Sequence, residues 1–232
     1  MAAIDPVRRV DGLRGPMPWQ QDALDVACEI DPATGLFYYR KVVVVIVRQA
    51  GKTSLSRGKI THRALTQPRA SILYTAQDRN MARRRLEKSF LEPLEASQLA
   101  PFLAPAAPGR SRAGWDGTNG REKVKFANAS EIFIIAAQKK TAGHGDTLPE
   151  AHLDEYFAHA DTRLEQAVAP TMITVAGAQR WLLSAAGDAD STALWAEVEA
   201  GRARCQSGQH GRTCYIEYSW PDDADRDDPA TW

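Results

Sequence analysis

The sequence has few cysteines, and their spacing limits what they can do. Three occur in 232 residues: Cys28, Cys205 and Cys214. An odd number at wide spacing argues against a disulfide framework and fits a reducing compartment. Cys205, His210 and Cys214 lie near one another in the sequence, but no CxxC motif accompanies them. A closed zinc site needs a full tetrahedral ligand set, so we expect structural or incidental roles for these residues.

The sequence also lacks a long apolar run and an excess of charge. The longest apolar run, residues 42–47, is far too short to cross a bilayer, and no signal peptide is visible. The 29 Lys and Arg residues balance 29 Asp and Glu residues, so the overall charge does not indicate a nucleic-acid partner. A local basic patch is still compatible with one. The length and ordinary composition suit one α/β domain, or one domain with an appendage.

Helix and strand patterns alternate along the chain. Apolar spacing predicts helices over residues 19–30, 54–65, 80–94, 162–172 and 192–204. The helix over residues 162–172 is expected to be broken by Pro170. Strand patterns cover residues 38–47, 71–75, 151–153, 180–184 and 212–218, with a hairpin signal at 123–126 and 131–136. This alternation predicts an α/β fold with a mostly parallel, doubly wound sheet plus a β-hairpin. Residues 97–122 are expected to be irregular surface.

The two ends differ in composition from the middle. Residues 1–18 are rich in Pro and Gly and are expected to form an arm before a folded domain over residues 19–220. Residues 221–232 are acidic and poor in core residues, which is typical of a linker. We therefore expect a longer natural chain of which this is one part.

The first candidate site directly follows the apolar strand of residues 38–47. Its β-branched run indicates a central strand covered on both faces, and Gly51-Lys52-Thr53 comes between that strand and a predicted helix. A phosphate-binding loop needs this order, because backbone N–H groups at a helix start then face the phosphate. Gly51 would allow close approach, Lys52 would neutralise phosphate charge and Thr53 would bind Mg²⁺. The full pattern has glycine where this chain has Ile46, so a turn with a solvated lysine is the alternative.

The second candidate site is the acidic pair Asp154-Glu155, which follows the strand of residues 151–153. A carboxylate at a strand end can hold Mg²⁺ beside a phosphate-binding loop, and a neighbouring carboxylate can act as a general base on water. Adjacent residues point to different sides, so we assign Asp154 to the metal and Glu155 to the water. The alternative is a solvated loop acid, with Glu155 capping the next helix.

A third candidate is Ser184-Ala185-Ala186, at the end of the strand of residues 180–184. A small hydroxyl residue at this place could sense the loss of a γ-phosphate. A strand that runs into an ordinary turn is the alternative.

Five short segments follow one another in a characteristic order. They are Pro18-Trp19-Gln20, Arg48-Gln49-Ala50-Gly51-Lys52-Thr53, Tyr74-Thr75-Ala76-Gln77, Leu153-Asp154-Glu155 and Ser184-Ala185-Ala186-Gly187. In these segments the chain resembles the ATPase domain of tailed-bacteriophage terminase large subunits, from about Pro18 to the acidic end. A glycine-poor loop that opens with Arg48 is more typical of this family than of other P-loop NTPases. The resemblance implies a RecA-like P-loop NTPase fold of the additional-strand, catalytic-glutamate class.

The resemblance also implies a role for each matched residue. Glu155 and Arg48 would be catalytic, with Arg48 near the γ-phosphate, and Thr53 and Asp154 would hold Mg²⁺. The nucleotide-binding set would be Gln20, Arg48, Gln49, Ala50, Gly51, Lys52, Thr53 and Ser54. The Gln20 amide offers adenine a donor and an acceptor, although a surface helix residue is the alternative. Ser184, Ala185 and Ala186 would form the coupling motif.

At the level of function, the resemblance implies an ATPase motor that moves double-stranded DNA into a procapsid in the host cytoplasm. ATP and Mg²⁺ would be its cofactors, and its partners would be DNA, a portal protein, a small terminase subunit and further copies in a ring. The isolated domain could be a monomer. The family's nuclease domain would follow the linker, so we expect no DNA cleavage by this chain. A helicase-like remodelling ATPase and a nucleotide-binding assembly module without turnover are the alternatives. Glu155 weighs against the second, because a site without turnover needs no water-activating acid.

Two further features concern arginine and lysine. Terminases use an arginine finger from a neighbouring subunit, but the loop where relatives carry it has His144 here. Arg112, Arg121 and Arg163 are possible substitutes. Residues 83–85 and 139–140 are basic and are candidates for DNA contact. A solvated helix face is the alternative for the arginines.

Overall fold

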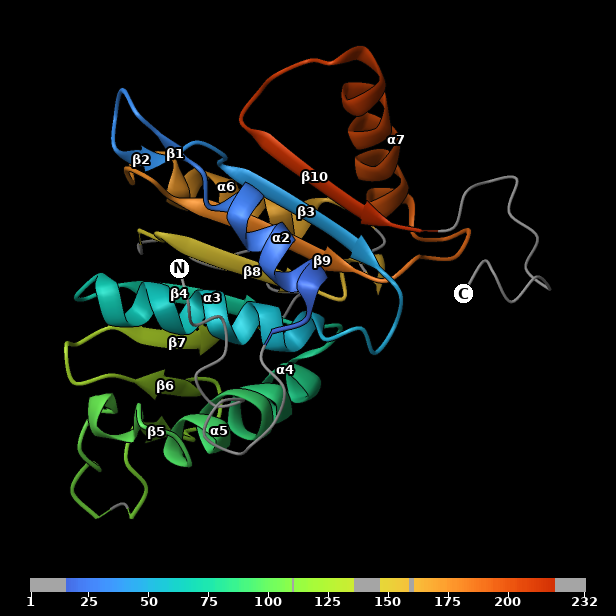
Figure 1. Ribbon diagram of the computed structural model, residues 1–232. Helices are drawn as coiled ribbons and strands as arrows, with labels where there is room; N and C mark the ends of the chain where they lie inside the picture. The colour runs from blue at the N-terminus through green and yellow to red at the C-terminus, as the bar shows by residue number, and fades with distance from the viewer. Residues whose placement is uncertain (1–15, 110, 136–146, 159–160, 220–232) are drawn as a thin grey trace.

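The computed structural model describes residues 16–109, 111–135, 147–158 and 161–219 (Figure 1). The arm up to residue 15, Lys139, Lys140, His144 and the acidic linker lie outside these described residues. The proposed division into arm, domain and linker therefore stays a prediction. Within the described ranges, no helix is long and apolar enough to span a membrane.

One large sheet organises the described part of the chain. Its strand order is β10-β3-β9-β8-β4-β7-β6-β5. Every pairing from β10 to β7 is parallel, and the pairings of β6 with β7 and β5 are antiparallel. The strands are β3 (Lys41–Ile46), β4 (Ser71–Thr75), β5 (Trp115–Asp116), β6 (Lys123–Lys125), β7 (Glu131–Ile134), β8 (Glu150–Asp154), β9 (Gln179–Ser184) and β10 (Thr213–Tyr218). The predicted mostly parallel sheet with a hairpin is confirmed.

Helices cover both faces of this sheet (Figure 1). They are α2 (Pro18–Ala27), α3 (Lys52–Thr66), α4 (Arg79–Arg85), α5 (Glu92–Glu95), α6 (Arg163–Met172) and α7 (Thr192–Ser207). On one face, α2 and α3 pack against the even-numbered valines of β3 and against β4, with α4 beside them. On the other face, α6 and α7 pack against Val43 and Val45. This two-sided cover explains the unbroken β-branched run of β3.

Some local elements depart from the sequence-based expectations. The helix predicted over residues 80–94 is α4 followed by a π-helical turn, η1 (Leu86–Leu91), and then α5. The expected break at Pro170 is wrong, because α6 continues through it to Met172. Short strands β1 (Ile30–Asp31) and β2 (Leu36–Phe37) flank the predicted turn and pair with each other. The region expected to be irregular contains η2 (Ala100–Phe102) and β5.

The strand order sets where chemistry can occur. Strand β9 lies between β3, which leads into the phosphate-loop motif, and β8, which ends in the acidic pair. An inserted strand at this place is the feature that the additional-strand class predicts. Because β3, β9, β8 and β4 are parallel, their carboxyl ends meet at one edge, where open α/β sheets bind ligands.

Candidate nucleotide-binding site

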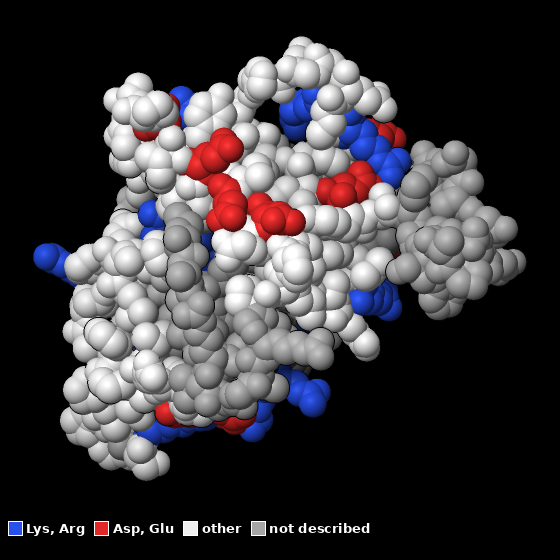
Figure 2. Space-filling view, viewed as in Figure 1, with Lys and Arg blue, Asp and Glu red and all other residues white. Residues whose placement is uncertain are grey.

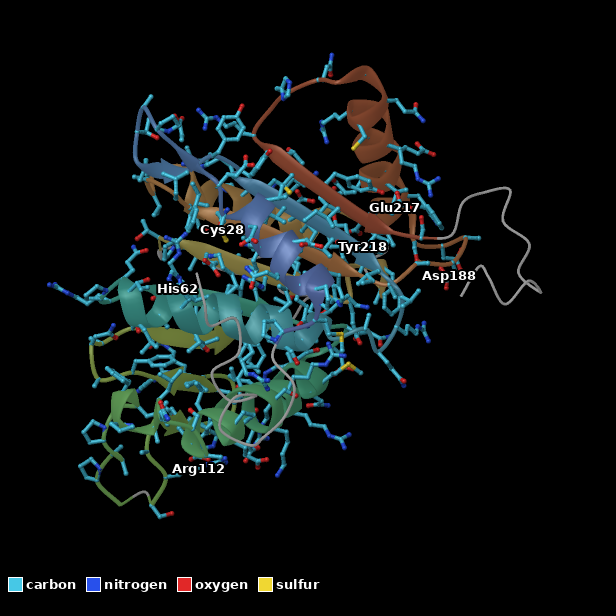
Figure 3. All side chains as sticks on the ribbon, in the orientation of Figure 1. Cys28, His62, Arg112, Asp188, Glu217 and Tyr218 are labelled. Atoms are coloured by element: carbon cyan, nitrogen blue, oxygen red, sulfur yellow. The ribbon has the colours of Figure 1, made fainter. Side chains whose placement is uncertain are left out.

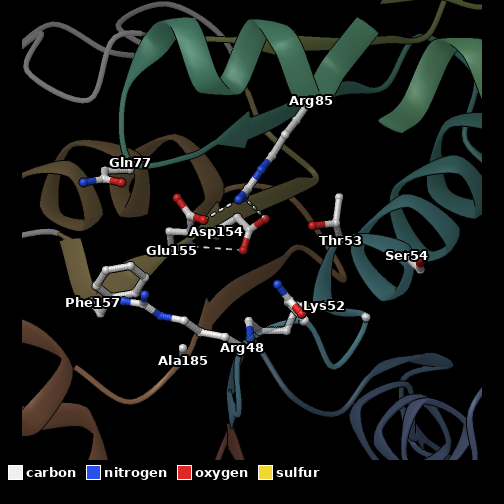
Figure 4. Close-up of a pocket in the computed structure, with 12 residues that line it drawn as sticks. Arg48, Lys52, Thr53, Ser54, Gln77, Arg85, Asp154, Glu155, Phe157 and Ala185 are labelled. Atoms are coloured by element: carbon white, nitrogen blue, oxygen red, sulfur yellow. Dashed lines mark hydrogen bonds and ion pairs between the residues drawn. The ribbon is translucent and has the colours of Figure 1, made fainter. Parts of the chain in front are cut away.

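A cavity of about 580 Å³ opens at this edge of the sheet (Figure 4). Its volume lies in the range of roughly 300–1,000 Å³ that is usual for small-molecule sites. The residues that line it are Arg48, Gln49, Gly51, Lys52, Thr53, Ser54, Gln77, Arg85, Asp154, Glu155, Phe157 and Ala185. The cavity thus brings together most of the residues predicted from the phosphate-loop motif and both acids of the pair.

The loop between β3 and α3 has the backbone shape of an anion site. Gln49 has φ 61 and Gly51 has φ 95, and Gly51 is the N-cap of α3 without a side-chain cap. The first N–H groups of a helix lack intrahelical partners, so they can bind an anion. The Lys52 ammonium donates to the carbonyl oxygens of Ile46 at 3.0 Å and Val47 at 2.8 Å. Burial lowers the pKa of Lys52, against the opposing charges of the acidic pair.

Side chains of helix α2 donate hydrogen bonds to the backbone of this loop. The Trp19 indole N–H donates to the carbonyl of Ala50 at 3.1 Å, and the Gln20 amide donates to the carbonyl of Gly51 at 2.9 Å. The Gln20 amide oxygen accepts from the backbone N–H of Met17, and Gln20 is only 1% exposed. Neither Gln20 nor Ala50 lines the cavity. The adenine contact assigned to Gln20 therefore stays a prediction, and its observed contacts position the loop.

The acidic pair lies at the end of β8, and other residues bond to both of its members. The Asp154 carboxylate accepts from the Tyr74 hydroxyl at 2.8 Å, from the Glu155 N–H at 2.9 Å and from the Arg85 guanidinium at 2.7 Å. Arg85 also forms an ion pair with Glu155. Burial raises the pKa of Asp154, and the Arg85 guanidinium opposes that rise. The Arg85 guanidinium is therefore the cation that contacts the buried Asp154 carboxylate.

Glu155 has two unusual features. Its φ is 57, in the left-handed region that residues with a side chain adopt rarely. Its Oε2 atom is buried and has no hydrogen-bond partner among the described residues. Glu155 lines the cavity, and a carboxylate there can act as a general base on water.

The third candidate segment is linked to the acidic pair through Phe157. The Ser184 hydroxyl accepts from the Phe157 N–H at 3.0 Å, and the Ser191 hydroxyl donates to the Phe157 carbonyl at 2.8 Å. The Arg48 guanidinium lies over the Phe157 ring, 5.4 Å from its centroid. Ala185 lines the cavity, whereas Ser184 and Ala186 do not. Ser184 thus contacts the segment that follows Glu155.

A buried polar network lies beneath the cavity and joins α3 to β8. The Ser56 hydroxyl is 2.8 Å from Nδ1 of His152, and Nε2 of His152 is 2.9 Å from a carboxylate oxygen of Glu150. Glu150 also forms ion pairs with Lys59 and Arg63. Ser56, His152, Glu150 and Lys59 are all buried. These contacts fix the distance between the helix that carries the phosphate loop and the strand that carries the acids.

Three cavity residues, Gln77, Arg85 and Phe157, had no role at the nucleotide site assigned from the sequence. Arg85 belongs to the basic trio considered for DNA contact, but its side chain points into the cavity, whereas Arg83 and Arg84 are exposed. The available signal was its spacing, because Arg85 lies one helical turn after Met81 on the apolar side of its helix. No comparable signal marked Phe157.

The arginines considered as fingers lie elsewhere. Arg112 is held by Glu87 and Glu95 at the edge of the molecule that Figure 3 shows below the sheet. Arg163 pairs with Asp161 on the surface. Figure 2 shows acidic side chains grouped near α2, which carries exposed Asp22 and Asp25, and scattered basic ones. Among the described residues of that face, no continuous basic surface for DNA is visible.

Comparisons with known proteins agree with this geometry at the level of the fold. No protein-family model matches the sequence, and no curated protein matches it. Among solved structures, the HK97 bacteriophage large terminase aligns over 100% of this chain with a TM-score of 0.71 and 20% identity. The ATPase domain of the Thermus phage P74-26 large terminase aligns over 93% of this chain and 85% of its own, with a TM-score of 0.61 and 15% identity.

A third similar structure contains a nucleotide. It is the large terminase of a thermophilic bacteriophage in complex with ADP, which aligns over 87% of this chain and 45% of its own, with a TM-score of 0.57 and 14% identity. The chain spans about half of the HK97 large terminase, 47% of its length. From its strand order to its cavity, this chain has the P-loop NTPase fold of the ATPase domains of phage large terminases.

Proposed function

We propose that this chain is the ATP-hydrolysing motor domain of a viral DNA-packaging terminase, which moves double-stranded DNA into a procapsid. One observation carries the proposal: the loop of Gly51, Lys52 and Thr53 and the pair of Asp154 and Glu155 line the same cavity. The likeness of the fold to phage large terminases, one of them solved with ADP, supports the choice of nucleotide and of motor.

Residues of the loop between β3 and α3 would bind the triphosphate. Backbone N–H groups at the start of α3 and the Lys52 ammonium would bind its phosphates, and Arg48 would lie near the γ-phosphate. Lys52 reaches this position by leaving the carbonyls of Ile46 and Val47.

The donor set of the cavity fits magnesium. The Thr53 hydroxyl and the Asp154 carboxylate are hard oxygen ligands, and both line the cavity. These two residues would hold the ion, which when bound supplies charge neutralisation on the phosphates. Glu155, which lines the same cavity, would orient the attacking water and accept its proton.

The contacts of Phe157 suggest how the site communicates. Its ring lies under Arg48, and its N–H bonds to Ser184. A change of charge at the γ-phosphate would move Arg48 and, through Phe157, the coupling segment of Ser184, Ala185 and Ala186. That movement would be transmitted to DNA within a ring of copies that binds a portal protein and a small terminase subunit in the host cytoplasm.

Hydrolysis is tested first, with the purified chain. We expect magnesium-dependent ATP hydrolysis that Lys52→Ala removes together with nucleotide binding. Glu155→Gln should bind ATP and hardly hydrolyse it, while the surface control Glu131→Gln behaves like the unmodified chain. Near-normal turnover by Glu155→Gln would show that Glu155 is not the catalytic base.

Translocation is tested with partners. The chain, in the context of its full terminase, should support ATP-dependent protection of double-stranded DNA inside portal-bearing procapsids. Strand separation without packaging would favour the helicase-like alternative. The purified chain should not cut DNA. ATPase activity per molecule that rises with protein concentration would support an arginine finger supplied by a neighbouring copy.

A further inference from the structure

Arg85 holds both members of the acidic pair at once. One guanidinium nitrogen lies 2.7 Å from Oδ2 of Asp154, and the other forms an ion pair with Glu155 (Figure 4). The residue is the last of α4 and the N-cap of the π-helical turn η1. π-helical turns are found frequently at functional sites. The helix therefore changes its winding at the residue that reaches the acids.

The contacts of Asp154 leave little room for a second cation. Its Oδ1 accepts from the Glu155 N–H, and its Oδ2 accepts from Tyr74 and Arg85. Asp154 is 1% exposed, so an uncompensated charge there would be costly. Two other cationic side chains line the cavity: Lys52 donates to backbone carbonyls, and Arg48 lies over the Phe157 ring. Arg85 is thus the counter-ion of the buried acid in this structure.

A guanidinium and a divalent cation compete for the same oxygen atoms. Arg85 occupies Oδ2 of the carboxylate that is assigned to magnesium, and its positive charge would repel a metal ion in the same small cavity. The Arg85 side chain is 23% exposed, so it can withdraw towards solvent without disturbing the sheet. Asp154 and Glu155, in contrast, are fixed at the end of β8.

We propose that Arg85 is a placeholder for the metal, which keeps the acidic pair neutralised and must be displaced when a divalent cation binds Asp154. The proposal rests on the proposed function only in taking Asp154 as the metal ligand. It makes Arg85 a positioning residue that sets the metal requirement of the site. A purely structural ion pair would stay in place when a divalent cation is added, which separates the two explanations.

The same helix supplies a matched control. Arg84 precedes Arg85, is exposed, and loses the same charge on substitution by glutamine. Any general effect of net charge on cation binding would therefore appear in Arg84→Gln as well as in Arg85→Gln. An effect on the cavity would appear in Arg85→Gln alone.

The test measures Mn²⁺ binding to the whole chain without nucleotide, by the loss of the free-ion signal in electron paramagnetic resonance. We expect Arg85→Gln to bind Mn²⁺ about tenfold or more tightly than the unmodified chain, because a competing charge is removed. Arg84→Gln should match the unmodified chain, and Arg85→Gln combined with Asp154→Asn should lose the gain. Equal or weaker binding by Arg85→Gln, including no binding by either protein, would overturn the proposal.

A second measurement needs no variant. In the unmodified chain, the Arg85 side-chain N–H resonance should shift when Mg²⁺ is added, and that of Arg84 should not. No shift at Arg85 at saturating Mg²⁺ would also overturn the proposal. Neither measurement uses hydrolysis. A chain that gains Mn²⁺ affinity but hydrolyses no ATP would contradict the proposed function alone, and one that hydrolyses ATP without the gain would contradict the role of Arg85 alone.

Discussion

The hydroxyl oxygen of Ser56 lies 2.8 Å from Nδ1 of His152, and both residues are buried. Ser56 is on α3 one turn after Thr53, and His152 is on β8 shortly before Asp154. Because Nε2 of His152 faces the carboxylate of Glu150, that nitrogen carries the proton and Nδ1 accepts from Ser56. Burial lowers the pKa of His152, which favours this neutral form. One hydrogen bond therefore links the two halves of the candidate site.

Substitution of Ser56 by alanine tests this link. The change leaves a buried ring nitrogen of His152 without its partner, so we expect a loss of about 1–3 kcal/mol in the free energy of unfolding. Urea denaturation provides the measurement. Ser207→Ala, at an exposed helical hydroxyl that donates to its own helix, is the control. Equal stability of the two variants would contradict the role given to the Ser56–His152 contact.

Neutralisation of Glu150 should lower the free energy of unfolding more than Ser56→Ala does. Glu150 is buried and pairs with Lys59 and Arg63, so Glu150→Gln leaves these cations without a counter-charge. Loss of one partner from a buried ion pair typically costs about 3–5 kcal/mol. Glu131→Gln, which breaks the partly exposed pair with Lys123, should cost no more than about 1 kcal/mol. Similar midpoints for the two variants in urea denaturation would show that the Glu150 network contributes little.

The sheet could be predicted because apolar runs in the sequence mark its buried central strands. The run of valines before Ile46 is buried throughout, and the strands ending at Thr75, Asp154 and Ser184 were each found. Strand order depends on contacts distant in sequence, so a local pattern cannot give it. The sequence predicts a helix here but not the hydrogen-bond register of a single turn, so it does not predict the π-helical turn after Arg85.

The candidate site could be predicted only where its residues lie at or shortly after the end of a strand. Gly51 lies in the loop after β3 and Asp154 ends β8, and they line one cavity. Arg85 reaches that cavity from a helix, and only the packing of α4 distinguishes it from Arg84. Phe157 lines it because a serine on another element fixes its backbone. Such contacts arise from tertiary structure, which residue spacing does not encode.

Removal of the Phe157 ring should impair hydrolysis without unfolding the chain. The ring lies under the Arg48 guanidinium, and such cation–π contacts contribute about 0.5–2 kcal/mol. If that energy positions Arg48 in the transition state, Phe157→Leu should lower kcat by about 2- to 30-fold. Phe157→Tyr keeps an aromatic face and is the control. The proposed positioning role is wrong if both variants hydrolyse ATP equally well and bind nucleotide as before.

Gly201 marks the closest approach of α7 to β10. A Cβ at this position would lie 2.2 Å from a ring carbon of Tyr215, so Gly201→Ala must displace the helix or the ring. Overpacking of this kind costs about 1–3 kcal/mol in the free energy of unfolding, and the better helix propensity of alanine offsets at most about 1 kcal/mol. We therefore expect Gly201→Ala to be less stable than the unmodified chain. Gly211→Ala, where nothing lies within 4 Å of the added Cβ, is the control. Thermal unfolding of both variants would detect the difference, and a Gly201→Ala chain as stable as the unmodified one would show that α7 adjusts freely.

The contact of Glu217 with Arg202 should make stability depend on pH at the edge of the sheet (Figure 3). Hydrogen bonds from Arg202, opposed by burial, lower the pKa of Glu217 to about 2 from its ordinary 4.5. A carboxyl whose pKa is lowered by folding contributes stability above its ordinary pKa. That contribution is lost as the pH falls from 4.5 towards 2. Because Arg202 is 41% exposed, we expect it to be on the order of 1 kcal/mol.

Urea denaturation of the unmodified chain and Glu217→Gln at several pH values measures this contribution. Their difference in unfolding free energy should be constant near neutral pH and shrink steadily in the acid range, since the other carboxyls titrate alike in both proteins. Glu199→Gln, at an exposed position on α7, should show no such trend. A Glu217→Gln difference that stays constant down to the acid limit would mean that Arg202 does not stabilise the ionised carboxylate.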